Sequence, residues 1–420
     1  MKLIKSNSEV LFVVKAAVAV FITYLSMYAF RKPFTSALYA DYELWGVDYK
    51  ILLIITQLVG YTVSKYFGIK IISELSASKR TRTLVFLMAF SWLALLFFGI
   101  VPAPYNLPFM FLNGLPLGMI WGVVFSYIEG RRHTELLGVA MASSFIISSG
   151  IVKGVGSYLL LNLNVSEMWM PFFSGLVFLP ILFLGIYLLH SLKQPDEEDV
   201  LARTERKPMD AAERKAFFKR FAPGIIFSIC IYVCLTIFRD LRDNFAVEFW
   251  KSFGIENIPS LLILSELPIA LFVILIIGSM IFIKNNKLAF FMNFYILLLG
   301  GVLLLLSTIL FSNQLLSPTL WMVLVGFSMY LPYIAFHALF FERWIAYFKI
   351  KSNIGYLMYI VDAAGYLGST FVLLFKNFST IAYSWVDFFI LTAIVTSTLI
   401  ILLSIANYFY FKNQDKLIPS

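Results

Sequence analysis

The chain has few charged residues for its length. Charged residues make up 14% of its 420 positions, whereas soluble domains carry about 25%. Hydrophobic residues make up 60% of the chain. This composition excludes an ordinary soluble globular domain and indicates a protein that lies in a membrane.

Cysteine is almost absent, since Cys230 and Cys234 are the only two. They are four residues apart in one apolar segment, a spacing that does not suit a disulfide within a helix. No neighbouring cluster of ligands accompanies them, so a zinc site is not indicated. We expect both side chains to pack as small apolar groups, and we expect no metal.

Motifs of enzymes are missing as well. The sequence has no H-E-x-x-H pair, no nucleophile elbow, no acyltransferase His-x-x-x-x-Asp pattern and no nucleotide-binding loop. We therefore expect a protein that is not an enzyme and that has no cofactor.

Long apolar runs are abundant, and a run of about 20 such residues can span a bilayer as a helix. Twelve are expected, at 10–38, 50–72, 84–101, 107–128, 136–161, 170–190, 222–246, 260–283, 288–311, 317–341, 352–375 and 383–411. The predicted fold class is an all-α membrane protein with two pseudo-symmetric bundles of six helices.

A charged segment at 191–221 separates the two sets of six spans. The predicted domains are therefore an N-terminal bundle at 1–190, a linker at 191–221 and a C-terminal bundle at 222–420. Two bundles joined by a cytoplasmic linker are typical of transporters that rock around a central site.

Basic residues indicate the orientation. Lys and Arg gather in the linker and in the loops on the same side as both termini, while four of the six opposite loops carry one or none. The positive-inside rule then places both termini in the cytoplasm. The net charge of +9 reflects this topology, and we expect no nucleic-acid partner.

Two arginines occupy matching places in the two halves. An offset of 208 residues aligns Tyr24 with Tyr232, Phe30 with Phe238 and Arg31 with Arg239. Arginine in a membrane helix is costly, about 2.5–3.5 kcal/mol at its centre on insertion scales. The matched register predicts an anion site between the halves, and the alternative is that both side chains snorkel to the outer interface.

Four segments carry short motifs: YLSMYAFRKPF, GYTVSKYFGIKIISELSASKRTR, NGLPLGMIWG and GYLGS. They are similar to segments of the major facilitator superfamily, and within it of the organophosphate:phosphate antiporters. In the second segment, Gly68, Glu74, Lys79 and Arg80 fill the positions of the superfamily's gating-loop signature, with Glu74 in place of aspartate.

The resemblance implies a secondary transporter whose substrate contacts Arg31, Arg239 and Lys65. One departure concerns the fifth span, where the histidine of that group would fall near Ser148 or Ser149. Lys153, one turn later, is a candidate substitute. Packing of Lys65 on Glu74, or snorkelling, remains an alternative for that lysine. The residues predicted to contact the substrate are Arg31, Lys65, Arg239, Lys153, Ser149, Tyr24, Tyr28 and Tyr232.

Intramembrane acids leave a second mechanism open. Glu266 and Asp362 lie in apolar runs, where carboxylates often relay protons. Either of them relays a coupling proton or pairs with Lys153 or an arginine. His337 is grouped with these acids as a coupling or charge-pair candidate, and we expect it to be a hydrogen-bonded helix residue.

The first functional hypothesis is exchange of a small anion, an organophosphate against phosphate, by alternating access. The alternatives are proton-coupled symport of an anionic nutrient and a transporter-like membrane sensor. We expect a monomer whose partners are a small anionic substrate and the lipid bilayer. The expected location is a bacterial inner membrane.

Overall fold

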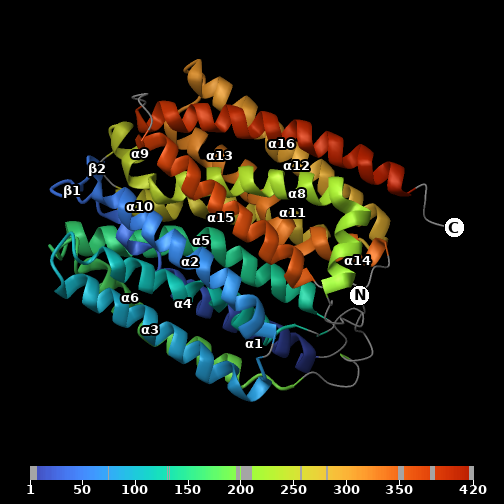
Figure 1. The fold of residues 1–420 in the computed structure, drawn as a ribbon, viewed down its shortest axis with the longest axis horizontal. Helices are drawn as coiled ribbons and strands as arrows, with labels where there is room; N and C mark the ends of the chain where they lie inside the picture. Colours follow the sequence, from blue (N-terminus) through green and yellow to red (C-terminus); the bar gives the residue numbers. More distant parts are fainter. Residues whose placement is uncertain are drawn as a thin grey trace.

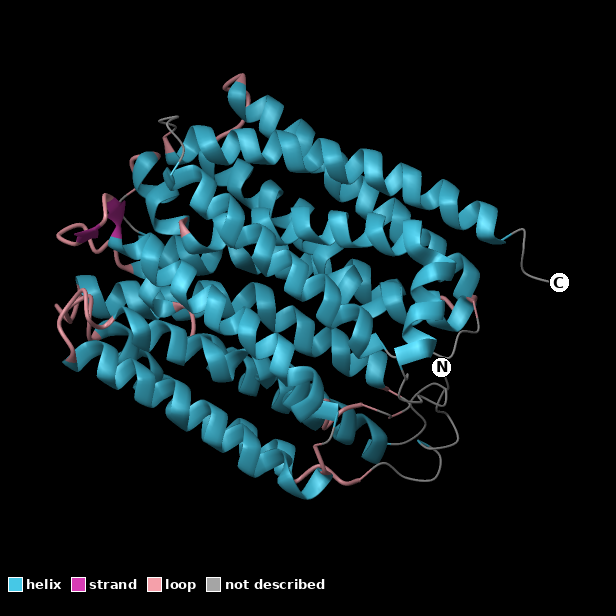
Figure 2. Ribbon diagram, viewed as in Figure 1, coloured by secondary structure: helices cyan, strands magenta, loops and turns pink. Residues whose placement is uncertain are grey.

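A computed structural model gives the structure of the chain. It describes residues 7–73, 75–129, 131, 133–194, 199, 211–255, 258–280, 282–348, 354–378 and 384–415. These residues form helices almost throughout (Figure 1; Figure 2). Twelve helical segments are long and apolar enough to cross a membrane, which confirms the predicted fold class. The chain is an integral multi-pass membrane protein.

The helices of the first half come in sequence order and are joined by short loops. They are α1 (Asn7–Ala29), α2 (Tyr49–Ser73), α3 (Arg80–Ile100), α4 (Leu107–Phe125), α5 (Thr134–Leu161) and α6 (Met170–His190). Short elements join the first three: η1 (Pro33–Ser36), the hairpin β1 (Glu43–Leu44) and β2 (Val47–Asp48), and η2 (Ala77–Lys79).

The second half is more interrupted. Its elements are α8 (Ala211–Asn244), α9 (Ala246–Ser252), α10 (Ile258–Leu264), α11 (Glu266–Met280), α12 (Asn286–Ser312), α13 (Pro318–Ala335), η3 (Phe336–Phe340), α14 (Phe341–Tyr347), α15 (Ile354–Phe378) and α16 (Trp385–Asp415).

Several expected spans differ from the observed helices. The first helix ends at Ala29 instead of continuing to residue 38, and Pro33 starts η1 soon afterwards. The eighth span is broken at Ser265 into α10 and α11. The tenth continues beyond residue 341 to Tyr347 through the π-helical turn η3. Such turns are frequent at functional sites.

Figure 1 shows the two halves side by side, with α1–α6 in blue and green and α8–α16 in yellow to red. Within the first half, α1 packs on α5 and α6, and α2 packs on α4. Within the second half, α8 packs on α15 and α16. Across the interface, α5 meets α10 and α11, and α2 meets α15. The domain boundaries at 190 and 222 stay a prediction, and 195–198 and 200–210 of the linker lie outside the described residues.

The contact of α5 with α10 requires a glycine. A Cβ added at Gly150 would lie 2.3 Å from the backbone oxygen of Leu262, so only glycine permits this approach. Small residues at helix interfaces in membranes have this effect in general. Figure 1 shows α10 toward the end of the molecule that carries the β1–β2 hairpin. This end is called the hairpin end below.

Candidate functional site

The end of α1 is fixed by two buried amides. Asn113 of α4 donates to the backbone oxygen of Phe30 over 2.9 Å and to Ser91 Oγ over 2.7 Å. Gln57 of α2 donates to the backbone oxygen of Arg31 over 2.9 Å and to Asn113 Oδ1 over 2.7 Å. These bonds satisfy carbonyl groups that a helix end leaves free. They therefore set the position from which the Arg31 side chain starts.

Replacing Asn113 with alanine is expected to destabilise the protein. The change removes the Asn113 donor from the Phe30 carbonyl and one of the two acceptors of the Gln57 amide. A buried polar group left without a partner costs about 1–3 kcal/mol. Thermal unfolding in detergent would measure the loss, with Asn313→Ala as the control, because Asn313 is exposed. Equal unfolding temperatures for the two variants would contradict this role for Asn113.

Arg31 lies between the halves and is 3% exposed. Its guanidinium carbon lies 4.0 Å from the centroid of the Tyr61 ring of α2 and 5.6 Å from that of Tyr366 of α15. Among the described residues, no carboxylate forms a salt bridge with Arg31, and its Nε has no hydrogen-bond partner. Arg31 is thus a buried cation held only by aromatic faces, and it does not snorkel to the outer surface.

Arg239 of α8 lies across from Arg31 and is 7% exposed. Its Nη2 contacts Asp240 Oδ1 at 2.8 Å, and its Nη1 donates to the hydroxyl of Tyr333. Its guanidinium carbon, like that of Arg31, lies 5.6 Å from the centroid of the Tyr366 ring. The two predicted arginines therefore meet around one tyrosine at the interface.

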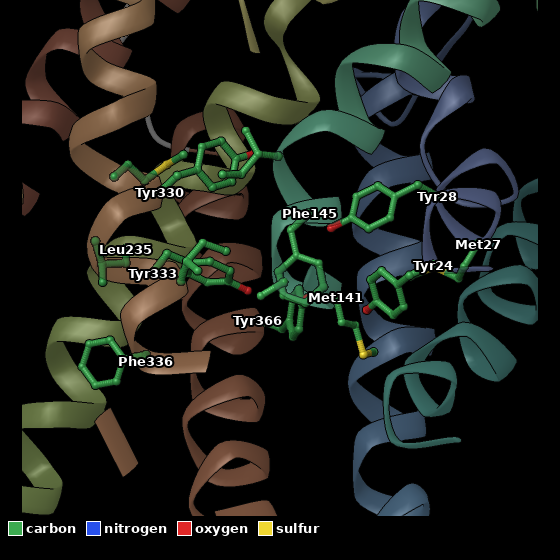
Figure 3. Close-up of a cluster of buried hydrophobic side chains, with 14 of the residues drawn as sticks. Tyr24, Met27, Tyr28, Met141, Phe145, Leu235, Tyr330, Tyr333, Phe336 and Tyr366 are labelled. Carbon is green, nitrogen blue, oxygen red and sulfur yellow. The ribbon is translucent and has the colours of Figure 1, made fainter. Parts of the chain in front are cut away.

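Aromatic side chains from both halves surround this place. Figure 3 shows the hydroxyls of Tyr24 and Tyr28 pointing from α1 toward Phe145, while Tyr333 points toward it from the other half. The ring of Phe145 lies 5.1 Å from that of Tyr24 and 6.5 Å from that of Tyr333. Tyr24 and Tyr28 thus face the interface, while their contact with a substrate stays a prediction.

Lys65 lies deeper along α2 and pairs across the interface. Its Nζ lies 3.0 Å from Asp362 Oδ2 of α15. Glu74, the partner considered from the sequence, lies outside the described residues. Tyr232 donates to Asp362 Oδ1, and its hydroxyl lies 2.9 Å from Nε2 of His337 in the π-helical turn η3. Tyr232 is therefore part of a chain of buried polar side chains. His337 is hydrogen-bonded to a residue of another helix, α8.

Lys153 and Ser149 of α5 both bond to Asp243, near the end of α8. Lys153 Nζ lies 2.7 Å from Asp243 Oδ1, and Ser149 donates to the same oxygen. Lys32 contacts the other oxygen of Asp243 at 2.5 Å and Asn244 Oδ1 at 2.8 Å. One carboxylate of the second half thus holds two lysines and a serine of the first.

This cluster corrects one sequence hypothesis and adds residues that it missed. Lys153 pairs with Asp243, and not with Glu266 or Asp362. Asp243 and Lys32 were not predicted, although Asp243 follows Arg239 by four residues and so lies one helical turn further along α8. Burial lowers the pKa of Lys32, and the Asp243 carboxylate opposes this shift.

The second acid, Glu266, begins α11 and bonds to Arg242. Its Oε1 accepts from Arg242 Nη1 over 2.7 Å. Of the two roles considered for this acid, the structure thus shows pairing with an arginine. Nearby, Lys50 joins the halves through Glu248 at 2.5 Å.

The gating-loop residues lie at the opposite end from the hairpin. Gly68 lies within α2 and not in a loop, and a Cβ added there would lie 3.1 Å from Met119 Cγ. Lys79 is exposed at the end of η2, and Arg80 begins α3. Only these three of the four predicted residues can be placed.

The charges at the interface do not balance pair by pair. Among the described residues named above, seven buried cations face five carboxylates; six cations are paired, since Asp243 serves two lysines, and Arg31 has no carboxylate. The cations are Arg31, Lys32, Lys50, Lys65, Lys153, Arg239 and Arg242, and the carboxylates are Asp240, Asp243, Glu248, Glu266 and Asp362. Among the described residues, no group of three or more His, Cys, Asp or Glu side chains could hold a metal ion. The arrangement suits an anion.

Two known transporter structures share this architecture. A mutant of the nucleoside transporter NupG aligns with a TM-score of 0.59 and 13% identity, covering 94% of this chain and 98% of its own. A D-xylose–proton symporter aligns with a TM-score of 0.57 and 13% identity, covering 92% and 96%. The fold is the major facilitator fold. Neither neighbour is an organophosphate:phosphate antiporter, so that narrower resemblance stays a prediction.

The sequence match is to one family. Residues 33–414 match the family described as "Family of unknown function (DUF5690)", and the chain belongs to this family. Comparison with curated protein sequences gives no match.

Proposed function

We propose that the chain is a secondary transporter that exchanges small anions, an organophosphate against phosphate, by alternating access. One observation carries this proposal: the Arg31 guanidinium is buried between the halves, forms no salt bridge with any carboxylate of the described residues, and faces Arg239 of the other half across Tyr366. A buried charge is costly unless it is paired. A bound anion would supply the missing partner.

Guanidinium groups favour phosphate among small anions. Each presents a planar fork of donors that matches two oxygens of a phosphate or carboxylate. With one fork from each half, a doubly charged phosphate ester can bridge the halves. The tyrosine hydroxyls around the site add neutral donors for further oxygens.

The same charges favour exchange over one-way release. When the site is empty, Arg31 faces the Arg239–Asp240 pair across a poorly solvated interface, and closing the halves over it is unfavourable. A bound anion offsets the cost of burying the unpaired Arg31 charge and permits the switch between the two open states. The empty transporter is therefore expected to reorient slowly from one side of the membrane to the other. Binding of a second anion on the far side speeds this reorientation.

Counterflow in proteoliposomes tests the proposal. Vesicles loaded with unlabelled phosphate should take up radiolabelled phosphate several-fold faster than empty vesicles. Phosphate esters inside should replace phosphate, and neutral sugars should not. Equal uptake by loaded and empty vesicles would contradict exchange.

A second candidate, proton-coupled anion symport, is favoured by the chain of Lys65, Asp362, Tyr232 and His337. Hydrogen bonds connect these four side chains, and two of them, Asp362 and His337, are groups that proton relays commonly use. In the same vesicles, uptake driven by an imposed pH gradient without internal anion would favour symport. Anion binding without any flux would indicate a sensor instead.

A further inference from the structure

A second basic site lies at the end of the first half that is opposite to the hairpin. A cavity of about 510 Å3 opens there between the start of α3 and the ends of α4 and α6. Its polar lining includes Arg80, Thr81, Tyr127, Arg131, His190 and Lys193, and none of its lining residues is acidic. The arginine site between the halves is formed by other residues.

The charge of Arg80 is not compensated by a salt bridge within the described residues. Its Nε is buried without a hydrogen-bond partner, and its guanidinium carbon lies 5.8 Å from the centroid of the Tyr127 ring. Arg131, by contrast, already contacts Asp199 at 3.9 Å and donates to the backbone oxygen of Tyr127 over 3.1 Å. Arg80 is therefore the cation with capacity for a further anion.

Neutral hydrogen-bonding groups stand beside it. Thr81 Oγ1 lies 2.8 Å from the Tyr127 hydroxyl and 3.1 Å from His190 Nδ1. Burial raises the pKa of Tyr127, so its hydroxyl stays protonated. Hydroxyl protons can rotate toward an incoming oxygen, so these groups suit an acceptor such as a phosphate.

The surface next to the cavity is apolar. Phe86 of α3 is 64% exposed and Tyr187 of α6 is 68% exposed, and both lie within two helical turns of the cavity lining, on helices that span the membrane. Leu189 and Leu192 extend this apolar character into the cavity wall. A ligand held here by a phosphate would have a path for acyl chains along α3 and α6.

We propose that this cavity binds a phosphate-bearing anion supplied by the headgroup of an anionic membrane lipid. Basic pockets between membrane helices on the cytoplasmic side are suited to such headgroups, and the positive-inside pattern predicts that this end is cytoplasmic. A free phosphate ester shares the same chemistry, and the test separates the two sources. The proposal does not depend on the transport function.

Thermal unfolding of the purified full chain in neutral detergent provides the test. Phosphatidylglycerol should raise the unfolding temperature by a few degrees, whereas phosphatidylcholine should not. Arg80→Gln should remove most of this shift. Lys79→Gln is the matched control, since it removes the same charge from an exposed neighbour outside the cavity lining.

A second pair of variants guards against misfolding of the Arg80 variant. Ser78 lines the cavity and Ser76 does not, although both are exposed. Ser78→Asp should therefore weaken the lipid effect more than Ser76→Asp. Stabilisation by inorganic phosphate or glycerol phosphate through Arg80, with no effect of the lipid, would support the site and assign it to a soluble anion. Equal lipid effects in both members of each pair would overturn the proposal.

Discussion

Exchange of phosphate should fall about 10- to 100-fold when Arg31 is replaced by lysine. Lysine keeps the positive charge but loses the planar fork, and hydrogen bonds to charged groups contribute about 1.5–3 kcal/mol each. The ammonium group is also more strongly hydrated than a guanidinium and less suited to the face of Tyr61, which now holds Arg31 at 4.0 Å. Initial rates of counterflow and stabilisation by phosphate would measure the loss.

The controls for this variant concern folding and charge. Arg82→Lys makes the same exchange at an exposed position of α3 and should leave counterflow unchanged. The unfolding temperature of the Arg31→Lys protein without phosphate should stay close to that of the native protein, because Arg31 has no salt bridge to lose within the described residues. Undiminished phosphate binding in Arg31→Lys would rule out the arginine clamp.

Arg239→Lys should show a different pattern. Arg239 already holds Asp240 and the hydroxyl of Tyr333, so the change disturbs the empty protein as well as the complex. Stability without ligand and phosphate binding should therefore both fall. This contrast distinguishes Arg31, which has no salt bridge within the described residues, from Arg239, which already pairs with Asp240.

The sequence predicts the membrane architecture well because its cause is local. A run of about 20 apolar residues is sufficient for a spanning helix, and all twelve appear among the described residues. The matched positions of Arg31 and Arg239 can also be read from the sequence, because an offset of 208 residues aligns them. Each lies toward the outer end of the first expected span of its half. The structure buries both arginines around Tyr366, while the anion site itself stays a prediction.

Helix interruptions were not predictable in the same way. The break at Ser265 lies in a continuous apolar segment, and the π-helical turn η3 interrupts another. Pro268 lacks the N–H that would bond to the Leu264 carbonyl and so gives the break at Ser265 a local cause, and Pro332 precedes η3. Tertiary contacts accompany both interruptions, since α10 lies against Gly150 and His337 bonds to Tyr232 of another helix.

Partners of the buried charges were the least predictable feature. Lys153 had several candidate acids, and hydropathy cannot choose among residues that are distant in sequence. Which acid pairs with Lys153 depends on the part of α8 that lies beside α5. Only the three-dimensional fold shows this. Asp243 was therefore missed, although it bonds to more side chains of the first half than any predicted acid.

Asp243→Asn is expected to open the protein at the hairpin end. Asp243 neutralises Lys32 and Lys153, and its loss leaves two buried ammonium groups without a carboxylate. Removing one partner of a buried ion pair costs about 3–5 kcal/mol, and the protein can avoid this cost by separating the halves and admitting water. Since about 1.4 kcal/mol is a factor of ten in an equilibrium, the open population should rise at least ~10-fold.

Labelling of a cysteine placed at Ser36 would measure this opening. Ser36 is 5% exposed and donates to the backbone oxygen of Lys153 over 3.0 Å, so a membrane-impermeant maleimide reaches it only when the halves part. With Cys230 and Cys234 replaced by serine, Asp243→Asn should speed labelling at least ~10-fold, and Asp41→Asn at the exposed hairpin end should not. Unchanged labelling would show that Asp243 does not hold the halves together. Faster labelling that phosphate then slows would indicate that Asp243 occupies Lys32 and Lys153 in place of a substrate anion.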